Sequence, residues 1–185
     1  MKEFDFHRLL IKEFEANGAA AFKYGKMGFM PIGHKNYFDL LLFHKNKWVP
    51  NPIAIEAKTN ENFSAITTAM ESQIQKKYLY KPFRCDEMGW SGELPCVALI
   101  TLSGYEEGLV YRKNFKEASN FFVDRFAWRF SYRKFAIMYK YGGNFWVSYE
   151  NKYIGLFNDA VIHPYKIEGG KTVYQGDFRG GVVDG

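Results

Sequence analysis

The sequence has few cysteines and no long apolar run, and each shortage excludes a class of protein. Its two cysteines, Cys85 and Cys96, stand eleven positions apart and lack the paired spacing of a zinc site, so we expect free thiols. No apolar run approaches the roughly 20 residues that a bilayer-spanning helix needs. The chain enters directly into an amphipathic segment without a signal-peptide pattern. These features predict a cytoplasmic protein with no membrane partner.

Internal repeats and low-complexity linkers are also lacking, so we expect the 185 residues to form one domain, alone or with an appendage. Charge and aromatic residues are plentiful: the formal net charge is +5, and aromatics make up 19% of the chain. An excess of basic residues suits a polyanionic partner, although it is also ordinary for a soluble enzyme.

Two apolar runs, residues 37–43 and 53–58, carry charged side chains and have the length and turn-rich flanks of buried strands. Asp39 lies inside the first run, and an ionised carboxylate there is costly without a counter-charge or a metal ion. Glu56 and Lys58 close the second run and, two residues apart, point to the same face of a strand. A neighbouring strand would bring Asp39 alongside Glu56.

These residues suit the hydrolysis of a phosphodiester. The carboxylates of Asp39 and Glu56, with the backbone carbonyl of Ala57, make a hard oxygen site that favours Mg²⁺ over Zn²⁺. Such an ion activates water and neutralises phosphate charge, while Lys58 orients the nucleophile or stabilises the pentavalent state. The alternative is a structural ion pair on a sheet. Convergence of three charged groups within two apolar strands favours the metal site.

The pattern of Asp39 followed seventeen positions later by Glu56-Ala57-Lys58 resembles the PD-(D/E)xK nuclease superfamily. Within it, residues 37–39, residues 55–59 and a following helix that contains Gln73 resemble the RecU-type Holliday junction resolvases. The resemblance covers roughly residues 4 to 115 and implies a restriction-endonuclease-like core, in which a mixed sheet has a helix on each face. It also implies Mg²⁺ or Mn²⁺ as cofactor, branched DNA as substrate, a homodimer, and an assisting role for Gln73 at the metal-bound water or the phosphate.

Helices are predicted over residues 4–17, where an apolar stripe ends at Asn17-Gly18, and from residue 64 to about residue 81. Glu13 flanks the buried face of the first helix. In many nucleases of the superfamily a glutamate of that helix contributes to the metal site, so the resemblance makes Glu13 a further ligand. The alternative is that Glu13 pairs with a lysine at the helix edge.

The predicted fold class is α/β. Residues 19–24 and 96–102 are expected to form strands, residues 82–95 a loop, and residues 135–141 and 144–149 a hairpin. Residues 152–157 would extend the sheet, and the glycine-rich tail from residue 168 would be loose. We expect a nuclease core over residues 1–115 and an aromatic, basic and β-rich extension for substrate binding or dimerisation over residues 116–185.

Basic residues in three regions are predicted to contact DNA, and they are Lys26, Lys35, Lys76, Lys77, Arg125, Arg129 and Arg133. For the helix lysines the alternative is a solvated face. For the arginines, which alternate with aromatic residues, a core or a dimer interface is an equal alternative. His34 could touch a phosphate or act as a base, but a lone loop histidine is more often merely solvated.

Two rival functions remain at this point. A restriction or homing-type endonuclease would use the same chemistry on specific duplex sites and would read bases with the segment after residue 115. A nucleic-acid-binding module without catalysis is the second rival. The clustered carboxylates argue against it, because they repel a polyanion unless a cation joins them.

Overall fold

The computed structural model describes residues 1–24, 38–59, 81–105, 135–141, 143–149 and 152–162, and the short segments 165–168, 171–174, 178–179 and 182–183. Several predicted features fall outside these ranges: residues 64–80 of the second predicted helix, with Gln73, then His34 and all seven predicted DNA contacts. The described part has a mixed α/β architecture. No helix within it is long and apolar enough to cross a membrane.

The described elements of the first half of the chain are α1 (Glu3–Ala16), β1 (Ala20–Lys23), β2 (Leu40–Phe43), β3 (Ile53–Lys58), β4 (Pro82–Cys85), a short 3₁₀ helix (Asp86–Met88), β5 (Trp90–Glu93), β6 (Cys96–Thr101) and α3 (Leu102–Tyr105). The second half contributes β7 (Phe135–Tyr141), β8 (Asn144–Tyr149), β9 (Lys152–Gly155), β10 (Val161–Ile162), β11 (Tyr165–Glu168), β12 (Lys171–Tyr174), β13 (Phe178–Arg179) and β14 (Val182–Val183).

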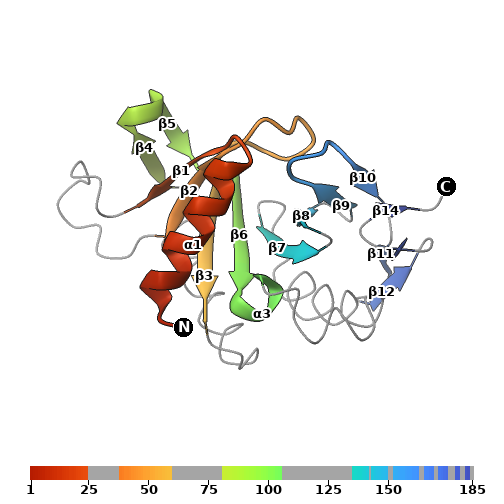
Figure 1. Cartoon of the computed structure of the whole chain (residues 1–185). Coiled ribbons are helices and arrows are strands. Elements are labelled where there is room, and N and C mark those ends of the chain that lie inside the picture. Colours follow the sequence, from red (N-terminus) through yellow and green to blue (C-terminus); the bar gives the residue numbers. More distant parts are fainter. Residues whose placement is uncertain are drawn as a thin grey trace.

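Eight strands form one curled mixed sheet in the order β1-β2-β3-β6-β7-β8-β9-β10 (Figure 1). Strands β1, β2 and β3 form an antiparallel meander, β3 pairs in parallel with β6, and β6 pairs in parallel with β7. From β7 to β10 the pairing is antiparallel again. The sheet therefore contains strands from the predicted core, residues 1–115, and from the predicted extension, residues 116–185.

Helix α1 lies across one face of the sheet and confirms the predicted apolar stripe. Phe6, Leu10 and Phe14 recur every four residues, and each is fully buried. Burial of such a side chain stabilises the fold by roughly 1.5–3 kcal/mol. The helix ends where predicted, because Gly18 takes a left-handed φ of +83° that favours glycine.

The central strands are buried on both faces. In β3, Ile53, Ile55 and Ala57 belong to the core beneath α1, and the intervening Ala54 is buried on the opposite face. All six residues of β6 are buried too, as expected for a strand between two parallel neighbours. The predictions of a strand at residues 53–58 and of a hairpin formed by residues 135–141 and 144–149 are confirmed, and the strand predicted over residues 96–102 ends one residue earlier, at Thr101.

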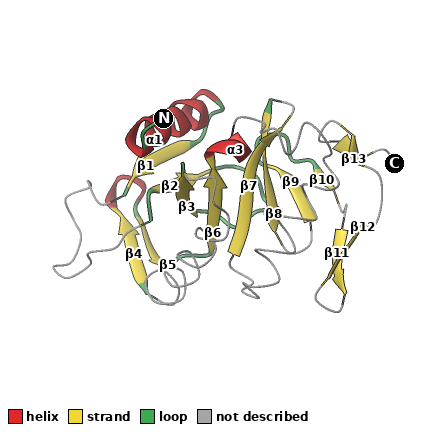
Figure 2. Cartoon of the chain, turned by 90° about the horizontal axis from the view of Figure 1, so that it is seen from below, coloured by secondary structure: helices red, strands yellow, loops and turns green. Residues whose placement is uncertain are grey.

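Two expectations are corrected, and a third is met only in part. Residues 82–93 form the antiparallel β4-β5 hairpin instead of a loop, and Phe83 and Cys85 alternate with exposed neighbours. The prolines and charged residues of this segment interrupt its hydropathy pattern, so the alternation could not be recognised in the sequence. The tail beyond residue 168 is not simply loose, because β11 pairs with β12 and β13 with β14. Helical cover is sparse in the described part: α1 and α3 lie on the same side of the sheet (Figure 2).

Both cysteines are free thiols in the structure, and both are buried. Burial raises the pKa of the Cys85 and Cys96 thiols. Since the thiolate is the reactive form, both side chains behave as small apolar core groups.

His44, in the turn between β2 and β3, makes stability depend on pH. Its Nδ1 accepts the Asn46 N–H at 3.1 Å, and its Nε2 lies 3.0 Å from the Pro50 carbonyl oxygen, which fixes a neutral ring. Burial lowers the pKa of His44 below 6.5. In the unfolded chain His44 has its ordinary pKa, so the unfolded chain takes up a proton at a higher pH than the folded chain does. The free energy of unfolding therefore decreases as the pH falls from the unfolded pKa to the folded pKa.

We therefore expect His44→Gln to reduce the loss of stability on acidification. The urea midpoint of the wild type should fall more steeply from about pH 7.5 to about pH 5.5 than that of the variant. At neutral pH the variant should lose roughly 1–2 kcal/mol, because hydrogen bonds of the ring are lost. Equal slopes in the two proteins would show that His44 does not carry this dependence.

Candidate metal and catalytic centre

Backbone hydrogen bonds hold Asp39 just before β2, beside β3. Its N–H donates to the Ile55 carbonyl at 2.9 Å, and its carbonyl accepts the Tyr24 N–H at 3.1 Å. The preceding Phe38 is buried between the rings of Tyr24 and Phe83, with centroids 4.2 and 5.2 Å away. The strand proper begins only at residue 40. Because an aromatic anchor and two backbone bonds fix this point of the chain, the Asp39 carboxylate has a defined position.

Three charged side chains surround Ala57 in β3. The Ala57 N–H donates to Asp39 Oδ2 at 2.8 Å. On either side of it, Glu56 and Lys58 form an ion pair, with Lys58 Nζ 3.0 Å from Glu56 Oε1. Glu56 is only 3% exposed. Asp39 therefore contacts the backbone of β3 between Glu56 and Lys58. Glu56 is not among the described residues whose ligand atoms gather at Asp39, so its predicted role as a metal ligand stays a prediction.

The lysine is held in its charged form. Burial lowers the pKa of Lys58, but attraction and hydrogen bonding to Glu56 outweigh it, and the charges of Asp39 and Glu3 add smaller contributions in the same direction. The net pKa of Lys58 is raised above its usual value. Lys58 is consequently an ammonium group at neutral pH, suited to stabilising negative charge.

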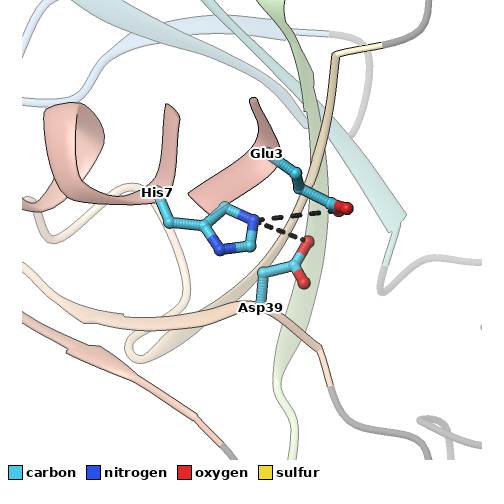
Figure 3. A group of neighbouring side chains, drawn as sticks. All are labelled: Glu3, His7 and Asp39. Atoms are coloured by element: carbon cyan, nitrogen blue, oxygen red, sulfur yellow. Dashed lines mark ion pairs between the residues drawn. The ribbon is translucent and has the colours of Figure 1, made fainter. Parts of the chain in front are cut away.

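A second group of side chains meets Asp39 from the helix side. His7 Nε2 lies 3.5 Å from Asp39 Oδ2 and 3.9 Å from Glu3 Oε1 (Figure 3). One ligand atom from each of the three residues lies within 4.8 Å of the others. Both helix residues stand in the first two turns of α1, which begins at the end of the sheet where β3 ends (Figure 1).

Glu13, predicted as a further ligand, has other partners. Its Oε1 accepts the Tyr105 hydroxyl at 2.7 Å and pairs with Lys140 Nζ at 3.0 Å. It is not among the three residues whose ligand atoms gather at Asp39. These contacts correspond to the alternative of a glutamate that pairs with a lysine. The predicted role of the Ala57 carbonyl as a ligand stays a prediction.

The sequence did contain a signal for the residue that we missed. His7 is a polar residue between Phe6 and Leu10 in a buried stripe, and it is only 5% exposed. A titratable side chain in such a position requires a partner. Glu3 stands four residues before His7, on the same face of the helix.

Comparison of the chain with protein-family models, with curated proteins and with solved structures finds no match. Its function has to be inferred from the arrangement of its own residues.

Proposed function

We propose that the chain is a metal-dependent nuclease that hydrolyses phosphodiester bonds in DNA. The observation that carries the proposal is the gathering of Asp39, Glu56 and Lys58 around Ala57, where two acids and an ammonium group share one end of a buried strand. The order of α1, the β1-β2-β3 meander and the parallel β6 is also compatible with the core implied by the PD-(D/E)xK resemblance.

Each residue has a distinct role in this proposal. Asp39 and Glu56 would hold Mg²⁺, since carboxylates are the ligands that this ion prefers. The ion supplies charge neutralisation at the phosphate and a water of lowered pKa. Lys58, as an ammonium group, orients the nucleophile and stabilises the charge that develops on the phosphate oxygens. Its ion pair with Glu56 keeps it at this end of β3.

Branched DNA is the proposed substrate, and a homodimer the proposed form, because the resemblance to RecU-type resolvases implies both. Paired cuts in two symmetric strands require two active sites, which a dimer supplies. The net charge of +5 supports a polyanionic substrate of this kind.

The test is cleavage of a four-way junction, a flap, a linear duplex and a single strand, each with Mg²⁺ and with EDTA. We expect symmetric nicking of the junction by the wild type. Glu56→Gln keeps the size of the buried side chain but removes its charge, and it should slow cleavage by roughly 100-fold or more. Glu15→Gln is the matched control, since Glu15 lies exposed on α1, and it should cleave like the wild type.

The panel separates the proposal from its rivals. Discrete cuts in long duplex DNA would replace the resolvase with a restriction-type enzyme and keep the chemistry. Retained binding without metal-dependent cleavage of any substrate would refute the nuclease and favour a binding module. Equal activity of Glu56→Gln and the wild type would remove Glu56 from the site.

A further inference from the structure

His7 is a buried side chain that lacks hydrogen-bond partners. Neither Nδ1 nor Nε2 forms a hydrogen bond within the described part of the chain, although the residue is only 5% exposed. Leaving a buried polar group unsatisfied costs roughly 1–3 kcal/mol. A fold that keeps an imidazole in this position needs another interaction to offset that cost.

The direction of the ring indicates what that interaction is. Nε2 points at the carboxylates of Glu3 and Asp39, but it stands 3.9 and 3.5 Å from their oxygens, without a hydrogen bond to either (Figure 3). Two atoms that bind one octahedral ion at ~2.1 Å are ~3.0 to ~4.2 Å apart. Both separations from Nε2 lie inside this interval, and the Glu3 and Asp39 oxygens lie within 4.8 Å of each other. The imidazole is thus spaced from each carboxylate as two ligands of one ion are.

The three donors differ in chemistry from the all-oxygen site expected from the sequence. One imidazole nitrogen joins two carboxylates, and imidazole favours first-row transition metals, whereas Mg²⁺ binds almost only oxygen. Two carboxylates balance the charge of a divalent cation. Glu3 is half exposed, so its side chain can adjust to an ion, while the Ala57 N–H holds Asp39 in place.

We infer that Glu3, His7 and Asp39 form a binding site for a divalent first-row transition-metal ion, which takes Mn²⁺ in preference to Mg²⁺. The site shares Asp39 with the proposed nuclease centre. Only the use of the bound ion in hydrolysis rests on the proposed function. Binding of the ion does not, because it is measured separately from cleavage.

The test is a titration of the full chain with Mn²⁺, in which electron paramagnetic resonance measures the free ion. Glu3→Gln removes a half-exposed carboxylate and should weaken Mn²⁺ binding roughly tenfold or more, because even an indirect partner of a metal ligand is worth that much. Asp5→Asn removes an exposed acid from the same helical turn and serves as the matched control, with a change of about twofold or less.

A second measurement identifies the imidazole directly. Electron spin echo modulation from a ¹⁴N nucleus should be present with Mn²⁺ bound to the wild type and to Asp5→Asn, and absent in His7→Gln. Tenfold excess Mg²⁺ should displace little Mn²⁺ from the wild type. Binding that is equal in the wild type and Glu3→Gln would overturn the site, and so would the absence of ¹⁴N modulation in the wild type.

The outcomes also separate this inference from the proposed function. Metal-dependent cleavage that needs Glu56 and Lys58, with Mn²⁺ binding insensitive to Glu3→Gln, would leave the nuclease standing and refute the Glu3, His7 and Asp39 site. Mn²⁺ bound through nitrogen in a protein that cleaves no DNA would support the site and refute the nuclease.

Discussion

Lys58→Ala is expected to reduce DNA cleavage by roughly 100- to 1,000-fold while DNA binding stays within a few-fold of the wild type. The ammonium group lies 3.0 Å from Glu56 and stays protonated at neutral pH, so in the proposed reaction it would act on charge that develops at the phosphate. Removing such a group lowers the rate of the chemical step more than it weakens ground-state binding. Single-turnover cleavage of a junction and a binding titration in the presence of Ca²⁺ measure the two quantities separately.

Two further variants distinguish a loss of catalysis in Lys58→Ala from a folding defect. Lys58→Ala leaves the Glu56 carboxylate without the counter-charge of Lys58, and loss of one partner of a buried pair is destabilising. Lys58→Arg keeps the charge and should retain more activity than Lys58→Ala. Lys45→Ala removes an exposed lysine elsewhere and should cleave normally. If binding and cleavage fall together in folded Lys58→Ala protein, Lys58 contacts DNA and does not act in the chemical step.

Phe14→Ala should lower the free energy of unfolding by roughly 3–5 kcal/mol, the usual cost of truncating a buried aromatic ring. Phe14 is fully buried, and its ring centroid lies 4.8 Å from that of Phe145 in β8 and 6.4 Å from that of Phe157. The side chain thus joins the N-terminal helix to strands from the second half of the chain. Urea denaturation followed by circular dichroism measures the change.

Phe4→Ala is the control for this core contact. Phe4 lies on the same helix but is 44% exposed, so its loss should cost less than about 1 kcal/mol. A similar cost for the two substitutions would contradict the assignment of the buried face of α1.

Local pattern was enough to predict α1, β3, β6 and the β7-β8 hairpin. The buried residues of α1 follow the helical period, whereas β3 and β6 are short uninterrupted apolar runs, and a glycine or a polar turn marks the end of each element. The β4-β5 hairpin was not predicted, because its strands are short and half exposed. Phe83 is buried there by the rings of Tyr24 and Phe38, which come from distant parts of the sequence.

The sequence by itself determined that Asp39, Glu56 and Lys58 accompany two neighbouring strands, because charged residues in apolar runs are visible without coordinates. Only the tertiary structure decided which residues of α1 meet them. Glu3 and Glu13 stand ten residues apart, about 15 Å along a helix, and periodicity alone does not say which turn meets the end of β3. Packing of Phe6, Leu10 and Phe14 fixes the position of α1 on the sheet, so that Glu3 and His7 lie beside Asp39 and Glu13 pairs with Lys140.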